Sequence, residues 1–477
     1  MRCEIEGQAM SERLFGTDGI RGVANEYPIT PEVALRLGRA IARVLIAQRR
    51  GRHKVVIGKD TRVSGYMLET ALTSGLVSEG ARVLLTGPVP TPAVAYLTKS
   101  MACDAGIMLT ASHNPYADNG IKIFGPDGYK LSDALEGEVE LLLQDDDLSG
   151  PGVRAEVGKA FRVDDAVGRY IEFAKRAVGA GSLEGLKVVV DCANGAGYFI
   201  GPLIFDELGA EVIELGTKPN GRNINEKCGA LHPEEAAESV RTHWADIGVC
   251  LDGDADRVIF CDENGKVVSG DRVLCLCAKA LHASGGLRGG AMVATVMSNL
   301  GLRDALGKEG IALEMTGVGD RLVLERMREK NYALGGENSG HIIFADHATT
   351  GDGIMSALKV LQVMKENGAK LSELADCMKE YPQELLSLPV REKPPVESVP
   401  ALQEAIANAE AVFNGEGRTL VRYSGTEKKI RILVECVDAG RAKEQANAIA
   451  GRCKRRSGFE RERTVACQEE RGAGSAE

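Results

Sequence analysis

The residues best suited to chemistry follow a short apolar segment at 106–109. Ser112, His113, Asn114 and Pro115 come soon after it. The segment predicts a buried strand, and Pro115 ends any regular structure, so the loop should present the Ser112 hydroxyl at a strand end. Open α/β sheets bind their ligands at such ends. Ser112 is therefore a candidate nucleophile, although an ordinary polar turn would have the same composition.

A group of acidic residues follows another apolar segment, at 247–251. Asp252, Asp254 and Asp256 alternate along an extended stretch, so their carboxylates can point the same way and converge on one hard cation. Oxygen-only ligation favours Mg²⁺, Mn²⁺ or Ca²⁺. An EF-hand does not fit, because Arg257 stands at the sixth position, where that loop needs glycine. The alternative is a turn of solvated aspartates.

Four segments together resemble the α-D-phosphohexomutases. T-A-S-H-N-P at 110–115 is similar to the phosphoserine loop of that family, and Y-A-D-N-G-I-K at 116–122 is similar to its bacterial phosphoglucosamine mutases. D-G-D-A-D-R at 252–257 resembles the metal-binding loop, in which glycine is common where Ala255 stands. G-E-N-S-G-H at 336–341 resembles the sugar-binding loop. R-Y-S-G-T-E-K-K-I-R at 422–431 resembles the phosphate-binding loop, with Tyr423 and Lys428 where proline is usual.

The resemblance implies a role for each residue that matches these loops. Ser112 would carry a phosphoryl group and would bind Mg²⁺ together with Asp252, Asp254 and Asp256. The further catalytic residues implied are Arg21, Asn114, Lys122, Arg257 and His341. The residues implied to bind the sugar and its distal phosphate are Glu337, Ser339, Arg422, Ser424, Gly425, Thr426 and Arg431.

Three of these roles depend on the resemblance alone. Lys122 is implied as the acid or base at the sugar oxygen, with His341 assisting, and Arg21 as the arginine that reaches the phosphoryl group. Residues 13–25 are glycine-rich and non-periodic, so we expect a loop around Arg21. Without the resemblance, the same residues would be a surface lysine on a strand, a histidine at a strand start and a solvated arginine.

The implied activity is an intramolecular phosphotransfer that interconverts glucosamine 6-phosphate and glucosamine 1-phosphate through a bisphosphorylated sugar. Glucosamine 1-phosphate would supply the synthesis of UDP-N-acetylglucosamine and cell-wall precursors. The alternatives are a phosphomannomutase or phosphoglucomutase of the same family and a non-catalytic phosphosugar-binding protein. A serine hydrolase using Ser112 and His113 is disfavoured, because adjacent residues rarely form a nucleophile and its base, and the sequence has no G-x-S-x-G motif.

Composition limits the location and the partners. No apolar stretch is long enough to cross a membrane, and the opening residues do not resemble a signal peptide, so we expect a cytoplasmic protein. The 12 cysteines include no C-x-x-C pair, which favours reduced thiols. A net charge of −10 argues against nucleic acid and requires basic residues to be concentrated around an anionic phosphosugar. A homodimer remains open.

Strand and helix patterns alternate along the chain, which predicts α/β domains with largely parallel sheets. Thr30 and Pro31 have the residue types of a helix start, and prolines at 389, 394, 395 and 400 predict a linker before a last, smaller domain. The resemblance implies a four-domain architecture, with three similar mixed α/β sheet domains and a smaller C-terminal α+β domain around a central cleft. The expected limits are an N-terminal extension at 1–10, domains at 11–160, 161–262, 263–380 and 381–456, and a disordered tail at 457–477.

Overall fold

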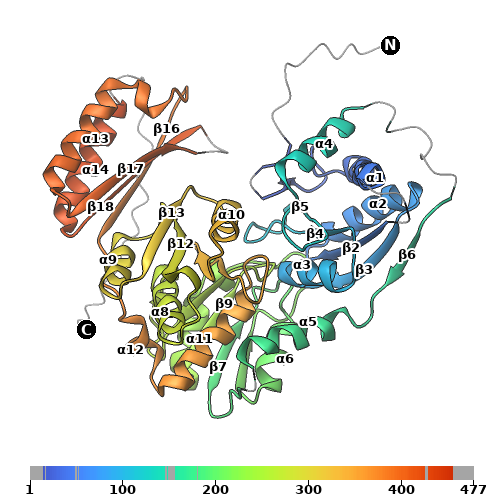
Figure 1. Cartoon of the computed structure of the whole chain (residues 1–477), viewed down its shortest axis with the longest axis horizontal. Helices are drawn as coiled ribbons and strands as arrows, with labels where there is room; N and C mark the ends of the chain where they lie inside the picture. The colour runs from blue at the N-terminus through green and yellow to red at the C-terminus, as the bar shows by residue number, and fades with distance from the viewer. Residues whose placement is uncertain are drawn as a thin grey trace, which may run out of the picture. The chain divides into compact units, whose positions relative to one another are not determined.

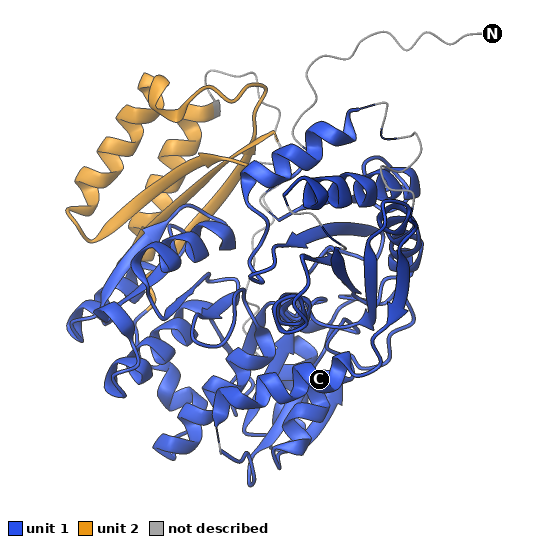
Figure 2. Cartoon of the chain, turned by 45° about the vertical axis from the view of Figure 1, so that its right-hand side comes forward, with its two compact units in different colours: residues 1–379 blue, residues 380–477 orange. Residues whose placement is uncertain are grey.

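The computed structural model describes residues 14–16, 18–48, 51, 53–145, 148, 156–179, 181–424 and 428–454. The chain divides into two compact units, which meet between Lys379 and Glu380 (Figure 2). The first unit contains three mixed sheets, and the second contains one antiparallel sheet with two helices. This confirms the α/β class, with three mixed-sheet parts and a smaller C-terminal α+β part.

The first sheet has six strands (Figure 1). In spatial order they are β1 (Ile20–Val23), β5 (Asp118–Phe124), β4 (Ala105–Leu109), β2 (Lys54–Lys59), β3 (Arg82–Pro88) and β6 (Lys159–Arg162). β4, β2, β3 and β6 run parallel to one another, β5 is antiparallel to β4, and the edge strand β1 is antiparallel to β5. Every residue of β4 is buried, which explains its unbroken apolar sequence.

Helices cover both faces of this sheet. α1 (Pro31–Gln48), α2 (Ser64–Ser78) and α4 (Asp133–Leu143) share an apolar cluster with one face, and α3 (Thr91–Ser100) packs against the other. The Thr30 hydroxyl accepts a hydrogen bond of 3.3 Å from the Val33 amide, which confirms the predicted start of α1. Arg21, expected in a loop, lies on edge strand β1 instead, because the pairing with β5 satisfies that backbone.

The second sheet repeats the mixed pattern. Its strands, in spatial order, are β11 (Val267–Val268), β10 (Val258–Cys261), β9 (Ile247–Leu251), β7 (Lys187–Asp191) and β8 (Glu211–Leu215). Its helices are α5 (Ala166–Lys175), α6 (Ile200–Glu207) and α7 (Glu234–His243). β9, β7 and β8 are parallel, β10 is antiparallel to β9, and β11 is antiparallel to β10. The first and second sheets continue to Arg162 and Val268, slightly past the expected domain limits, which remain predictions.

The third sheet has four strands and lies among five helices. The strands, in spatial order, are β13 (Ala312–Thr316), β12 (Ala291–Thr295), β14 (Leu334–Gly336) and β15 (Ile342–Phe344). The helices are α8 (Gly270–Ala283), α9 (Leu300–Lys308), α10 (Asp320–Lys330), α11 (Gly353–Asn367) and α12 (Leu371–Ala375). One continuous apolar cluster includes residues of all three sheets, which accounts for their forming a single unit.

The second unit corrects one expectation and adds a strand. Its sheet has the order β16 (Gln383–Pro389), β18 (Lys429–Cys436) and β17 (Gly417–Tyr423), and its helices are α13 (Pro400–Phe413) and α14 (Ala439–Lys454). The predicted linker is wrong over 383–389, because these residues form an edge strand, where a proline at the end is tolerated. The central strand β18 was not predicted.

Short 3-10 turns lie at Arg176–Val178, Gly229–Leu231, Arg288–Gly290 and Val396–Ser398. Within the described part of the chain, no helix combines the length and the apolar character that crossing a bilayer requires.

Candidate active site

The Ser112 loop follows β4, as the sequence predicts. Ser112 is 1% exposed, and its φ of 52° lies in the left-handed region, which is uncommon for a residue with a side chain. Its hydroxyl donates a hydrogen bond of 2.6 Å to Asp252 Oδ2 and lies 3.3 Å from Nδ1 of His113. Burial, with Arg257 and Arg21 nearby, lowers the pKa of His113 to about 4. The serine is therefore held against the acidic loop of the second sheet.

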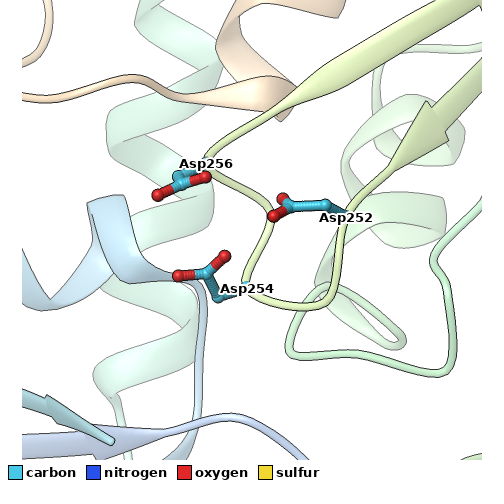
Figure 3. Close-up of side chains that lie close together, drawn as sticks. All are labelled: Asp252, Asp254 and Asp256. Atoms are coloured by element: carbon cyan, nitrogen blue, oxygen red, sulfur yellow. The ribbon is translucent and has the colours of Figure 1, made fainter. Parts of the chain in front are cut away.

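The three aspartates occupy the loop between β9 and β10, and their carboxylates face one another (Figure 3). Each contributes one oxygen to a group whose members all lie within 4.8 Å of one another, and all three residues are buried. Among the described residues, Asp254 Oδ1 and Asp256 Oδ1 are buried without a hydrogen-bond partner. Buried oxygens normally have partners, so this arrangement fits a cation-binding site.

Electrostatics agree with a cation at this position. Burial, reinforced by Asp254 and Asp256, raises the pKa of Asp252 well above its usual range. Burial alone would also raise the pKa of Asp256, but the charges of Lys122 and His341 hold it well below its usual value. A bound divalent cation would keep all three carboxylates ionised.

Lys122 lies on β5 and points at the same carboxylates. Its Nζ is 2.9 Å from Asp254 Oδ2, 3.1 Å from Asp256 Oδ2 and 3.4 Å from Asp18 Oδ2. Burial would lower the pKa of Lys122, but these three carboxylates raise it well above its usual value. Lys122 is therefore a protonated, 2% exposed group within the site, and not a surface lysine.

Two arginines next to the triad have unused donors. The Nε atoms of Arg21 and Arg257 are buried without a hydrogen-bond partner in the described part of the chain. Arg21 pairs with Asp18 through Nη2, and Arg257 Nε lies 3.9 Å from Asp256 Oδ1. Such donors suit the oxygens of a phosphoryl group. The structure thus brings Arg21 and Arg257 to the Ser112 region, where the resemblance expected them.

His341 lies next to Asp256 of the metal-binding loop. Its Nε2 accepts a hydrogen bond of 3.1 Å from the Gly351 amide, and its Nδ1 lies 3.7 Å from Asp256 Oδ1. The residue is 2% exposed. Both ring nitrogens therefore face protein groups, and the contact with Asp256 suits a residue that orients this carboxylate.

The predicted sugar-binding residues occupy the turn between β14 and β15. Glu337 Oε1 accepts a hydrogen bond of 3.2 Å from the Gly319 amide. The Ser339 hydroxyl oxygen is buried and has no hydrogen-bond partner among the described residues. A carboxylate and an unpartnered hydroxyl in the same turn can take the hydroxyl groups of a sugar.

Asn114 has a local partner. Its Nδ2 donates a hydrogen bond of 2.8 Å to Asp118 Oδ2, so this side chain holds the loop closed toward β5. Three supporting residues were missed by sequence analysis. Thr91 Oγ1 donates to Asp254 Oδ2 at 2.5 Å, and Arg62 and Asn225 bond to the Ser112 loop. The available signal was a polar residue between a strand and a helix for Arg62 and at the start of a helix for Thr91.

The predicted phosphate-binding residues belong to the second unit. Arg422 and Arg431 stand opposite each other on β17 and β18, so they lie on strands and not in the loop between them. Burial and the charge of Arg431 lower the pKa of Arg422. Opposed like charges are destabilising unless an anion lies between them. Ser424 is buried, and Gly425 and Thr426 fall outside the described residues.

Comparison with known proteins identifies the family. The four models for phosphoglucomutase/phosphomannomutase match in order: alpha/beta/alpha domains I, II and III at residues 12–149, 168–265 and 269–381, and the C-terminal domain at 385–452. The phosphoglucosamine mutase of Anaeromyxobacter dehalogenans (strain 2CP-C) is 52% identical over 459 residues, which cover 94% of this chain and 100% of that protein. The chain belongs to the phosphoglucomutase/phosphomannomutase family.

Solved structures of phosphoglucomutase/phosphomannomutase relatives share the fold. A family protein from Burkholderia thailandensis matches with a TM-score of 0.77 at 25% identity, over 94% of this chain and 98% of that one. The N-acetylphosphoglucosamine mutase of Aspergillus fumigatus, solved with GlcNAc-6P and magnesium, matches with a TM-score of 0.64 at 19% identity, over 93% and 95% of the two chains. The resemblance drawn from the four loops is confirmed.

Proposed function

We propose that this chain is a phosphoglucosamine mutase, which interconverts glucosamine 6-phosphate and glucosamine 1-phosphate. The observation that carries the proposal is the Ser112 hydroxyl, buried and 2.6 Å from an aspartate of a three-carboxylate group. Relatives with that name support the choice of sugar, at 52% identity over 94% of the chain.

Mg²⁺ is the proposed metal. Asp252, Asp254 and Asp256 offer only oxygen atoms, which suits a small hard cation, and Ser112 adjoins them. When bound, the metal would withdraw electron density from the phosphoryl group and neutralise its charge. In this structure Lys122 Nζ neutralises the Asp254 and Asp256 oxygens that would hold the metal.

Two transfers complete the proposed reaction. In the first, a sugar hydroxyl forms a bond to phosphorus as the bond between phosphorus and Ser112 Oγ breaks; the proton of that hydroxyl passes to Lys122 Nζ, and Ser112 Oγ takes a proton from Asp252 Oδ2. In the second, Ser112 Oγ attacks the other phosphoryl group of the bisphosphorylated sugar, the bond between that phosphorus and the sugar oxygen breaks, and the two proton transfers reverse. Asp252 Oδ2 is placed to take the serine proton, and protonated Lys122 is placed to give one to the departing sugar oxygen.

The sugar must turn around between the two transfers, so the same residues must bind it in both orientations. Glu337 and Ser339 are proposed to hold the sugar hydroxyls, and Arg21 and Arg257 to hold the transferring group. The facing arginines Arg422 and Arg431 are proposed to bind the phosphate that is not reacting.

We also propose a cytoplasmic location. The cysteines of the described chain are free thiols, most of them buried, which supports a reducing compartment. The homodimer stays a prediction, which sedimentation analysis would test.

Intact mass spectrometry and a sugar competition test the proposal together. Active protein should carry one phosphoryl group on Ser112, and Ser112→Ala should lack it and lose nearly all mutase activity while staying folded. kcat/KM should be far higher for glucosamine phosphates than for glucose or mannose phosphates, because a site built for an amino group leaves a buried group unpaired with the wrong sugar. A Ser112→Ala variant of near wild-type rate would refute the mechanism. Preference for glucose or mannose 1-phosphate would move the chain to the alternative subfamily.

A further inference from the structure

Arg62 donates hydrogen bonds to main-chain carbonyl oxygens of the Ser112 loop. It follows β2 and is 0% exposed. Its Nη2 donates to the carbonyl oxygens of Ser112 at 2.9 Å and Asn114 at 2.8 Å. Its Nη1 donates to the carbonyl oxygens of Pro115 and Asp118, the latter at 3.1 Å. Four carbonyl oxygens of one loop thus converge on a single guanidinium.

Asp60 fixes the direction of this guanidinium. Its Oδ2 accepts a hydrogen bond of 2.9 Å from Arg62 Nε, and its Oδ1 accepts one of 2.9 Å from the Arg62 amide. Each of the N–H donors of the guanidinium therefore has an acceptor, and the buried positive charge has a buried carboxylate beside it. An ammonium group has neither the number nor the planar geometry of donors to replace it.

Asn225, in the segment between β8 and α7, approaches the same loop. Its Nδ2 donates to the Ser112 carbonyl at 2.8 Å and to the Asn114 carbonyl at 3.0 Å, the same two oxygens that Arg62 Nη2 contacts. Gly253 of the metal-binding loop packs against both groups. A Cβ at this position would lie 2.5 Å from the Ser112 carbonyl oxygen and 2.8 Å from Asn225 Nδ2, so a larger residue would not fit. The serine loop and the metal-binding loop therefore meet at the Ser112 carbonyl.

A loop that carries a phosphoryl group needs such hydrogen bonds for two reasons. The left-handed φ of Ser112 is unfavourable for a residue with a side chain and persists only where surrounding contacts determine it. The loop must also keep one geometry while its charge changes by about two units as the phosphoryl group leaves and returns. Tying the carbonyl oxygens to fixed donors turns them away from the phosphoryl group and keeps Oγ in line with the substrate.

We infer that Arg62 and Asn225 are positioning residues, which hold the Ser112 loop in the left-handed conformation that aims Oγ at Asp252. This inference rests on the proposed function for its catalytic consequence. Among the described residues, neither Arg62 nor Asn225 hydrogen-bonds to the three aspartates of the metal-binding loop or to the sugar-binding turn, so their removal should lower kcat and leave KM unchanged.

Two variants test the inference, each with a matched control. Asn225→Gly removes both side-chain hydrogen bonds, and glycine adopts the φ of 59° at this position without strain. Its control is Asn331→Gly, at an exposed position with a φ of 54°. Arg62→Lys keeps the charge and removes the planar set of N–H donors. Its control is Arg43→Lys, which alters a partly buried ion pair with Glu79 away from the site.

The measurements are kcat and KM, and hydrogen exchange of the amides at 110–118. We expect kcat to fall roughly 10- to 100-fold in Asn225→Gly and Arg62→Lys with KM unchanged. Amide exchange at 110–118 should rise in both, and the controls should change neither quantity. Unchanged exchange would overturn the loop support, and raised exchange with unchanged kcat would overturn the positioning role. Absence of mutase activity and of phosphoserine in the unmodified protein would instead refute the proposed function, and the exchange data would still decide the loop support.

Discussion

Replacing Lys122 by methionine should reveal how the site balances its charge. Among the described residues, the Lys122 ammonium is the positive group nearest to Asp254 and Asp256, at 2.9 and 3.1 Å. Its side chain is 1% exposed, and those of Asp254 and Asp256 are 0% and 6% exposed. Methionine keeps most of the side-chain volume and removes the charge. The variant therefore leaves buried carboxylates without compensation.

The size of the effect follows from this burial. Removing one partner of a buried ion pair costs about 3–5 kcal/mol, and solvent screens these carboxylates little. With about 2–4 °C per kcal/mol for a domain of a few hundred residues, the melting temperature in chelator should fall by on the order of 10 °C. Added Mg²⁺ should recover much of that loss, because the cation replaces the missing positive charge. Turnover should nevertheless stay down by roughly 10²–10⁴-fold, since the general acid is gone.

Thermal unfolding of the unmodified protein and of Lys122→Met, each in chelator and in Mg²⁺, measures how far the cation restores the melting temperature. Lys130→Met is the control, because Lys130 Nζ bonds to Asp18 and Asp320, both at 2.6 Å, and not to the triad. It should lose stability by a similar amount without a larger response to Mg²⁺. An equal Mg²⁺ response in Lys122→Met and in the unmodified protein would refute the reasoning. A change confined to KM would reassign Lys122 to substrate binding.

Three further predictions concern the metal, the distal phosphate and pH. Asp254→Asn removes one of three negative charges, so half-maximal activity should need more Mg²⁺; undiminished turnover of the unmodified protein in excess chelator would contradict a metal requirement. Arg431→Ala should raise KM in both directions of the reaction, because each orientation leaves one phosphate distal; an effect in one direction only would exclude a shared site. Burial raises the pKa of Asp352 from 3.8 to about 6, so the folded protein binds this proton more tightly and its stability falls as pH rises through that range. Asp352→Asn should therefore gain up to about 3 kcal/mol relative to the unmodified protein between pH 4 and pH 6.5, and parallel pH profiles of melting temperature would contradict this.

Local patterns predicted the elements that hold the site. The buried strand β4 follows from an unbroken apolar run, and the start of α1 from a threonine and a proline. The convergence of Asp252, Asp254 and Asp256 was also predicted, although the expected extended segment is wrong: these residues form a turn, with Ala255 at a φ of 56°. Each of these inferences needs only residues that are neighbours in the chain.

Local patterns failed where partners are distant. The strands β1, β16 and β18 are formed by residues whose composition is glycine-rich, proline-containing or charged, and pairing with another strand overrides that composition. Arg62 resembles any polar residue after a strand, and its role depends on carbonyl oxygens 50 to 56 positions away. Asn225 lies 113 positions from Ser112.

By itself, the sequence determined the chemistry available to this protein: a serine in a constrained loop, three oxygen ligands for a hard cation, and arginines for phosphate. Only the tertiary structure decided which groups meet. It places Ser112 on Asp252 across 140 positions and Lys122 on Asp254 across 132. It also buries both pairs: burial raises the pKa of Asp252, and the neighbouring carboxylates raise the pKa of Lys122 against the effect of burial, because a charge removed from water depends on the few groups that touch it. Those groups come from different sheets, which no local pattern of residues can specify.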